Sequence, residues 1–115
     1  MDFQIGEIYW LISDQEISHP HVIINNHSLN INNTLVVCSL TTNMNKINIP
    51  GNILLDLNEG DLDKKSIVEV SKETVINKSK LGKYIGRLSI ERVNQIIQRI
   101  GFINRSFLDT DRIIK

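Results

Sequence analysis

Two histidines flank a proline in the stretch SHPHVIIN (18–25), and they are the residues of this chain best suited to acid–base chemistry. His19 and His21 are two positions apart at the start of an expected strand, so both imidazoles can project from one face. Histidine can donate or accept a proton near neutral pH because its unperturbed pKa is about 6.5. The stretch admits three interpretations: an acid–base pair, half of a metal site, or a polar strand start satisfied by backbone or water.

A metal site is the weakest of these interpretations. Imidazole and thiolate are zinc ligands, so His19, His21, His27 and Cys38 qualify by residue type. However, the sequence has no CxxC or HxxxH spacing, and Cys38 lies in the middle of the apolar run TLVVCSL (34–40). We therefore expect no metal ion or other cofactor. The single cysteine also cannot form a disulfide within one chain, which favours a reducing, cytoplasmic setting.

Polar and basic side chains gather in two other segments that suit an RNA ligand. The amides and the lysine of the loop TTNMNKINIPG (41–51) are Asn43, Asn45, Lys46 and Asn48. Such groups can contact the phosphates and splayed bases of single-stranded RNA. The basic side chains before the expected helix are Lys78, Lys80, Lys83 and Arg87. Lysine plus arginine equals aspartate plus glutamate, at 13 each, so any polyanion site must be local. A solvated loop and a solvated basic edge are the competing interpretations.

Short strands must position most of these residues. In IGEIYWLI (5–12) a period of two predicts a strand that turns Ile8, Trp10 and Ile12 to one face, with Trp10 in the core. The other expected strands are 21–25, 34–40, 52–57 and 66–70, and a short sixth strand can form at 84–88. Five or six short strands at close spacing predict a mainly β fold, as a small barrel or a strongly bent sheet.

One helix is expected near the C-terminus, at SIERVNQIIQRIG (89–101). Ser89 can cap its N-terminus, Glu91 suits the positive end of its dipole, and Gly101 provides a C-terminal stop. Its apolar residues fall at helical spacing. We therefore expect one stripe of the helix to pack on the sheet.

The length of 115 residues suits one domain, which we expect at 1–103. The tail at 104–115 has no clear period, so we expect it to dock on the surface, form a second short helix or fray. No apolar stretch reaches the roughly 18 residues that cross a bilayer, so no membrane partner is expected.

Four phrases occur along the chain in a characteristic order. They are GEIYWL (6–11), HPHVIINN (19–26), LVVCSLTTN (35–43) and KLGKYIGRLS (80–89). Together they resemble the MazF/PemK family of toxins from bacterial toxin–antitoxin pairs, over residues 5–103. The resemblance implies an SH3-like, strongly twisted β-barrel of the CcdB/PemK type with a C-terminal helix. It also implies a homodimer, a cognate antitoxin as partner, and metal-independent, sequence-selective cleavage of single-stranded RNA, the activity of an mRNA interferase.

The resemblance also assigns roles to single residues. In the family an arginine precedes the proline of the second strand and a threonine or serine ends the third, and the two flank the scissile phosphate. Here His19 occupies the arginine position, and Thr41, followed by Thr42, matches the hydroxyl position. The resulting hypothesis makes His19 the proton-transfer group and Thr41 the phosphate donor, with His21 and Thr42 in support. The expected RNA-binding residues are Asn43, Asn45, Lys46, Lys80, Lys83 and Arg87.

Two departures from the family support a second hypothesis. The arginine is missing, and the position where some members carry a catalytic acid falls near Ser71. A chain that kept the barrel and the partner surface but lost cleavage is an RNA-binding or antitoxin-binding module. The first hypothesis predicts 2′-OH attack that yields a cyclic phosphate and a free 5′-hydroxyl, whereas the second predicts binding without cleavage.

Overall fold

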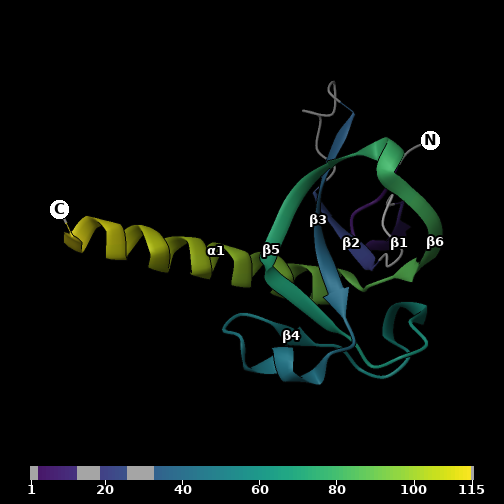
Figure 1. Cartoon of the computed structure of the whole chain (residues 1–115), viewed down its shortest axis with the longest axis horizontal. Helices are drawn as coiled ribbons and strands as arrows, with labels where there is room; N and C mark the ends of the chain where they lie inside the picture. The colour runs from purple at the N-terminus through teal and green to yellow at the C-terminus, as the bar shows by residue number, and fades with distance from the viewer. Residues whose placement is uncertain (1–2, 13–18, 26–32, 115) are drawn as a thin grey trace.

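Strands of one antiparallel sheet make up most of the computed structural model, which describes residues 3–12, 19–25 and 33–114, with side chains to residue 103. The strands are β1 (Glu7–Leu11), β2 (Pro20–Asn25), β3 (Thr34–Thr41), β4 (Ile53–Leu54), β5 (Ile67–Asn77) and β6 (Leu81–Arg87). The described connections contain the 3₁₀ helices η2 (Met44–Asn48), η3 (Glu59–Asp61) and η4 (Lys78–Lys80). The helix α1 (Ile90–Ile114) follows β6 (Figure 1).

The sheet curves strongly but does not close. Its strand order is β4-β5-β3-β2-β1-β6, and β5 and β6 arch around the inner strands in Figure 1. The two end strands, β4 and β6, are not paired with each other. The prediction of a mainly β fold with a C-terminal helix is therefore confirmed. The described part of the sheet is open, however, and does not form the expected closed barrel. With only two residues, β4 is too short to extend the sheet further.

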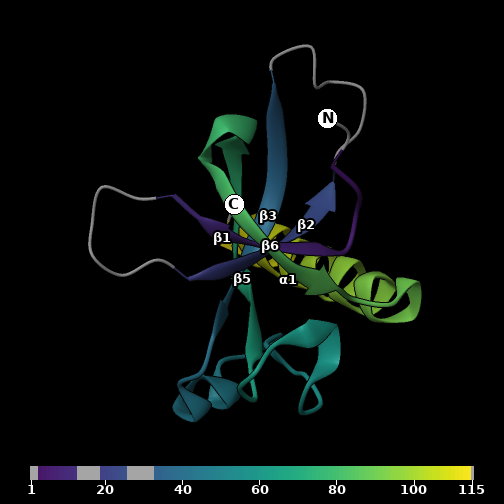
Figure 2. The same ribbon diagram turned by 90° about the vertical axis from the view of Figure 1, so that its right-hand side faces the viewer.

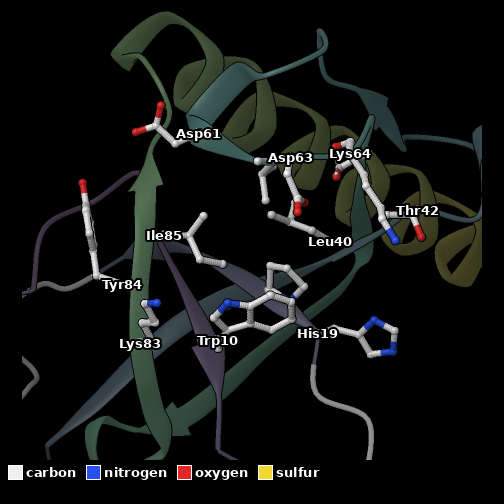
Figure 3. A pocket seen from close by; sticks show the side chains of 13 residues that line it. Trp10, His19, Leu40, Thr42, Asp61, Asp63, Lys64, Lys83, Tyr84 and Ile85 are labelled. Atoms are coloured by element: carbon white, nitrogen blue, oxygen red, sulfur yellow. Dashed lines mark hydrogen bonds between the residues drawn. The ribbon is translucent and has the colours of Figure 1, made fainter.

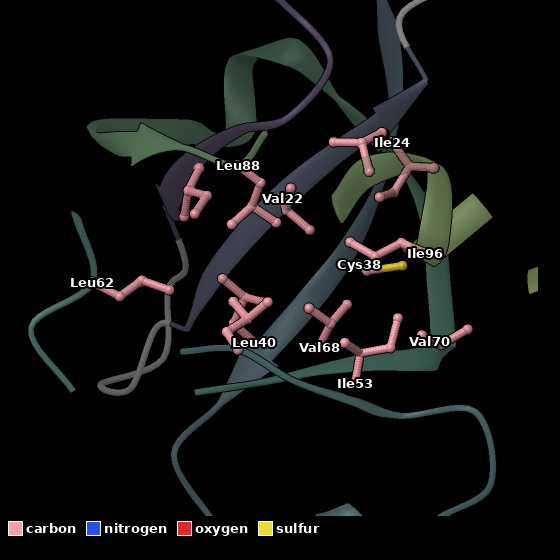
Figure 4. Close-up of a cluster of buried hydrophobic side chains, with 13 residues drawn as sticks. Val22, Ile24, Cys38, Leu40, Ile53, Leu62, Val68, Val70, Leu88 and Ile96 are labelled. Carbon is pink, nitrogen blue, oxygen red and sulfur yellow. The ribbon is translucent and has the colours of Figure 1, made fainter. Parts of the chain in front are cut away.

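The inner strands β2 and β3 have apolar residues on both faces because both faces of the sheet are covered there. Their side chains alternate between two buried clusters. The larger cluster takes Val22, Ile24, Cys38 and Leu40 from these strands (Figure 4). The smaller cluster, on the opposite face, takes Ile23, Leu35 and Val37 and adds Tyr9 and Leu81. The two-sided apolar pattern of TLVVCSL thus reflects the inner position of β3 in the sheet.

The helix α1 lies against one face of the sheet (Figure 2) and completes the larger cluster with the buried residues Val93 and Ile96. Ser89 caps the helix as predicted, because its Oγ accepts a hydrogen bond from the backbone N–H of Arg92 at 3.1 Å. The predicted stop at Gly101 is wrong, since α1 continues to Ile114. Gly101 is not among the glycines with positive φ, and a glycine ends a helix only where it leaves the helical conformation. No described helix is long and apolar enough to cross a membrane.

Three strand boundaries also differ from the prediction. The expected strand at 52–57 shrinks to β4, because the chain turns into η3 soon after Leu55. The expected strand at 66–70 extends to Asn77, because its polar second half pairs with the first half of β3, from Thr34 to Cys38. The short strand expected at 84–88 is the longer β6, which pairs with β1.

Candidate functional site

A pocket of about 490 Å³ lies where β1, the start of β2 and the end of β3 face β6 and the segment between η3 and β5 (Figure 3). Three residues singled out from the sequence line it: His19, Thr42 and Lys83. Its other polar and charged side chains are Asp61, Asp63, Lys64, Ser66 and Tyr84. Its apolar side chains are Trp10, Pro20, Leu40, Leu62 and Ile85. Two lysines and two aspartates thus line one pocket together with a histidine and three residues that carry a hydroxyl group.

Strand register brings the exposed His19 to this pocket. β2 pairs with β3 so that His21 lies opposite Ser39, and β1 pairs with β2 so that Trp10 lies opposite Pro20. Because the strands are antiparallel, His19, two residues before His21, lies level with Thr41, two residues after Ser39. His19 and the threonines that end β3 thus meet at one edge of the sheet, as the hypothesis requires.

The two threonines at the end of β3 have different surroundings. Thr42 lines the pocket, whereas Thr41 is half-buried and does not line it. The Thr41 Oγ1 accepts a hydrogen bond from the backbone N–H of Asn43 at 3.2 Å, so this side chain stabilises a local turn. This bond leaves the hydroxyl proton of Thr41 unused. The role of Thr41 as phosphate donor stays a prediction, and Thr42 is the threonine that lines the pocket.

His21 does not line the pocket and is buried, with 8% of its surface exposed. Its Nδ1 donates a hydrogen bond to the backbone oxygen of His19 at 2.8 Å, since a carbonyl can only accept. Burial lowers the pKa of His21, although the bond to His19 opposes the shift. His19 precedes the strand, so strand alternation does not bring the two imidazoles together. A neutral His21 that fixes the backbone of His19 suits an orienting role better than proton transfer.

A second polar group lies beside His21 on the same region of the sheet. Ser39, opposite His21, donates a hydrogen bond from Oγ to the Glu69 Oε2 at 2.7 Å. The buried Glu69 also forms an ion pair with Lys72 at 3.6 Å. The serine hydroxyl is thus bound to a carboxylate and not to the imidazole. Ser39 and His21 therefore do not form a serine–histidine nucleophile pair.

The remaining RNA-binding candidates lie outside the pocket, apart from Lys83. Asn43 caps η2, since its Oδ1 accepts a hydrogen bond from the backbone N–H of Asn45 at 3.1 Å. The backbone oxygen of the half-buried Lys46 accepts a hydrogen bond from the Asn52 Nδ2 at 3.0 Å. Lys80 and Arg87, on either side of Lys83 in the sequence, are exposed but do not line the pocket. The structure thus gathers only part of the predicted set.

The wall formed by residues 61–66 was not predicted as part of a site. It is held in place through η3, because Arg92 of α1 makes two hydrogen bonds to Glu59, Nε to Oε2 at 2.7 Å and Nη2 to Oε1 at 2.9 Å. On its other side η3 contacts β6 so closely that any Cβ at Gly86 would collide with the backbone oxygen of Gly60. A charged run after a turn is typical of solvated surface, so the sequence carries no signal for this wall.

The side chains of this wall differ in direction. In Figure 3, Asp63 and Lys64 point into the pocket, toward the side that holds Thr42 and His19, whereas the carboxylate of Asp61 points away. Asp63 therefore supplies a carboxylate to the pocket. The position near Ser71, where some family members carry an acid, lies elsewhere: Ser71 lines a separate hollow between β5 and α1.

Trp10 is not a core residue, contrary to the prediction. It is 41% exposed and lines the pocket, while Ile8 on the same strand is fully buried. The pairing of β1 with β6 is irregular between Ile8 and Leu11, so the regular alternation on which the prediction depended does not hold there.

Metal ligands do not converge in the described part of the chain. No group of three or more histidine, cysteine, aspartate or glutamate side chains is suitably placed among the described residues. Cys38 is buried, and burial raises the pKa of its thiol to about 12. A thiolate is therefore disfavoured at neutral pH. His27, the remaining candidate ligand, lies outside the described residues.

Comparisons with known proteins agree with this architecture. A family model described as the PemK-like, MazF-like toxin of type II toxin–antitoxin systems matches residues 4–103. An endoribonuclease in complex with its cognate antitoxin from a mycobacterial species has a similar fold, with a TM-score of 0.72, 20% identity, and coverage of 88% of this chain and 93% of that chain. The Mycobacterium tuberculosis toxin MazF-mt6 is similar, with a TM-score of 0.65, 21% identity, and coverage of 83% and 92%.

A further similar structure is MazE-MazF from Deinococcus radiodurans, with a TM-score of 0.72, 12% identity, and coverage of 89% of this chain and 96% of that chain. A comparison with curated proteins gave no match. At these identities the structures establish a shared fold, and the family match covers most of the chain.

Proposed function

We propose that this chain, which belongs to the PemK-like, MazF-like toxins of type II toxin–antitoxin systems, is an endoribonuclease that cleaves single-stranded RNA without a metal ion. The observation that carries the proposal is the pocket in which His19, Thr42 and Lys83 meet Asp63 and Lys64. Cognate antitoxin binding, homodimer formation and a cytoplasmic location belong to the same proposal. Support for the antitoxin comes from the similar folds that were solved with one.

The reaction needs three functions that the pocket residues can divide among themselves. Something must take the proton of the 2′-OH, something must protonate the leaving 5′-oxygen, and donors must stabilise charge on the phosphate. The Asp63 carboxylate takes the 2′-OH proton as the 2′-oxygen attacks phosphorus. The P–O5′ bond then breaks, and the His19 imidazolium gives its proton to the 5′-oxygen. The products are a 2′,3′-cyclic phosphate and a free 5′-hydroxyl.

Charge stabilisation is the function that the missing arginine leaves open. A histidine lacks the permanent charge and the forked donors of a guanidinium. Lys64 and Lys83 line the same pocket and provide two cationic donors for the phosphate, and the Thr42 hydroxyl provides a third, neutral donor. In this proposal different residues donate the proton and stabilise the charge: His19 is the general acid, and Lys64 and Lys83 bind the phosphate.

A binding module without cleavage is the second candidate. The observation that favours it is the placement of His21 outside the pocket, which leaves His19 as the one described imidazole there. This candidate keeps the RNA-binding or antitoxin-binding surface and predicts no strand scission.

Cleavage of a long single-stranded RNA in EDTA, with the fragment ends mapped, tests the proposal. The wild-type chain is expected to cut at discrete sites and to leave cyclic phosphate ends. His19→Ala and Thr42→Ala are expected to lower kcat by about 10²-fold or more, because each removes a group that acts on the reacting atoms. Thr41→Ala separates the two hydroxyls, and Arg99→Ala, at an exposed position on α1 outside the pocket, is the surface control. Intact RNA in every lane from a well-folded protein would leave the binding module as the better account.

A further inference from the structure

Trp10 is the single tryptophan of the chain, and the fold keeps it at the surface. It is 41% exposed, whereas its neighbours on β1, Ile8 and Tyr9, are buried. Its backbone lies between Pro20 of β2 and the strand β6, where a Cβ on Gly82 would lie 3.1 Å from the Trp10 backbone oxygen. A large aromatic ring is thus held by paired strands on both sides while its side chain remains open to the pocket.

The surroundings of the indole combine apolar and charged groups. Pro20, Leu40 and Ile85 line the same pocket and provide its apolar wall. In Figure 3 the Trp10 indole lies among Leu40, Ile85 and His19. Lys64 and Lys83 bring positive charge to the pocket. Among the described residues, none accepts a hydrogen bond from the indole N–H.

This combination fits a nucleobase better than an apolar side chain of a protein. An aliphatic side chain that entered the pocket would desolvate two ammonium groups and at least one carboxylate without pairing them. A base stacks its π-face on the indole and keeps its polar edge toward these charges, while its phosphates meet the lysines. Aromatic side chains beside basic groups are the usual means by which proteins hold single-stranded nucleic acid.

We propose that Trp10 stacks on an unpaired nucleobase of the nucleotide next to the phosphate that reaches His19 and Thr42. This inference rests on the proposed function, because it places the same RNA strand in the same pocket. Trp10 is a binding residue in this account and takes no part in proton transfer. Its stacking fixes which phosphate of the strand lies at His19, so it also contributes to the choice of cleavage site.

The test combines the fluorescence of Trp10, the only indole in the protein, with the fluorescence anisotropy of end-labelled strands, which also gives the affinities of variants that lack Trp10. The probes are a 2′-O-methyl 20-mer of mixed sequence, which lacks the attacking hydroxyl, and a strand of equal length with abasic residues. We expect the base-bearing strand to quench the fluorescence and the abasic strand to bind more weakly without quenching. Removing a stacked base costs about 1–3 kcal/mol, so Trp10→Leu is expected to weaken binding of the base-bearing strand by about 5- to 150-fold.

Variants separate stacking from fold and charge. Trp10→Leu is expected to leave the affinity for the abasic strand unchanged, and Trp10→Phe is expected to retain most of the affinity for bases. Phe102→Leu, a change at an exposed aromatic residue on α1 that does not line the pocket, is the matched control and is expected to have no effect. Thermal unfolding of each variant verifies the fold, which should tolerate changes at these exposed positions.

The outcomes also distinguish this inference from the proposed function. Quenching and Trp10-dependent binding without cleavage of ordinary RNA would support stacking and overturn the nuclease. Cleavage of RNA with equal affinities for Trp10→Leu and the wild-type chain would overturn stacking and leave the nuclease intact. A fluorescence change on adding the cognate antitoxin alone, with none from either oligonucleotide, would overturn nucleobase stacking and assign the indole to a protein interface.

Discussion

The carboxylate of Asp63 is the residue on which the proposed proton transfer depends, and Asp61 is its natural control. Both line the pocket, but Asp63 points into it and Asp61 points away (Figure 3). Asp63→Asn keeps the shape and removes the proton acceptor, so we expect kcat for RNA cleavage to fall by about 10²- to 10⁴-fold, the usual contribution of a general base. Single-turnover cleavage at saturating protein measures the effect on the chemical step.

Asp61→Asn is expected to leave cleavage within about twofold of the wild-type rate, because the Asp61 carboxylate points away from the pocket and takes no proton there. Asp61 has a φ of 59°, and asparagine adopts positive φ readily, so the variant should keep the local backbone. Equal losses from the two variants would mean that the pocket requires negative charge in general, and the assignment of Asp63 as proton acceptor would be wrong.

Single residues of the pocket differ in how well the sequence revealed them. The family resemblance pointed to His19 and to the threonine pair Thr41–Thr42, and the antiparallel register of β2 and β3 brings His19 and Thr42 to one pocket. Asp63 and Lys64 could not, because a folded contact between η3, Arg92 and Gly86 brings their segment to the pocket. Trp10 was wrongly placed in the core, because the alternation of residues along β1 gives no sign of its irregular pairing with β6, a strand about 70 residues further along the chain.

At the scale of elements, the contact between η3 and α1 depends on the pair formed by Arg92 and Glu59. Burial alone would raise the pKa of Glu59, but hydrogen bonds from Arg92 and from the backbone N–H of Asp56 outweigh it, so the pKa lies below its usual value. The pair therefore stabilises the fold above the ordinary carboxyl pKa, and this contribution is lost as the pH falls through the lowered value.

Arg92→Met is accordingly expected to lower the free energy of unfolding by about 1.5–3 kcal/mol at pH 7, the range for hydrogen bonds to charged groups. The deficit relative to the wild-type chain should shrink on acidification, because a protonated Glu59 no longer forms the ion pair. Urea denaturation at pH 7 and pH 3 measures both values. Arg99→Met, at an exposed position on the same helix, is the control, and a deficit that stays constant with pH would contradict the assigned role.

Elements with strong local patterns were predicted correctly, and those that depend on distant partners were not. The apolar run of β3 predicts a buried strand, and Ser89 predicts the start of α1, each from a few neighbouring residues alone. The polar second half of β5 is a strand only because it pairs with β3 from Thr34 to Cys38. The barrel expected from the family likeness is an open sheet in the described residues, since its closure depends on the end strands and not on any local pattern.

At the scale of the whole molecule, the expected domain at 1–103 predicts that the chain folds without its last residues. The larger core cluster already includes Ile96 and is flanked by Ile100 and Ile103, and the C-terminal part of α1 extends away from the sheet in Figure 1. A chain that ends at Ile103 is therefore expected to lose less than about 1 kcal/mol of unfolding free energy, because a helix gains most of its stability from packing.

A chain that ends at Gln95 is the matched control, since it removes the fully buried Ile96 and should unfold. Urea denaturation gives the stability of each chain, and sedimentation compares their masses with that of the full chain. If the chain ending at Ile103 keeps its stability but changes its mass, the tail belongs to an interface between copies. If it unfolds, residues 104–115 are part of the folding unit and the expected boundary at 103 is wrong.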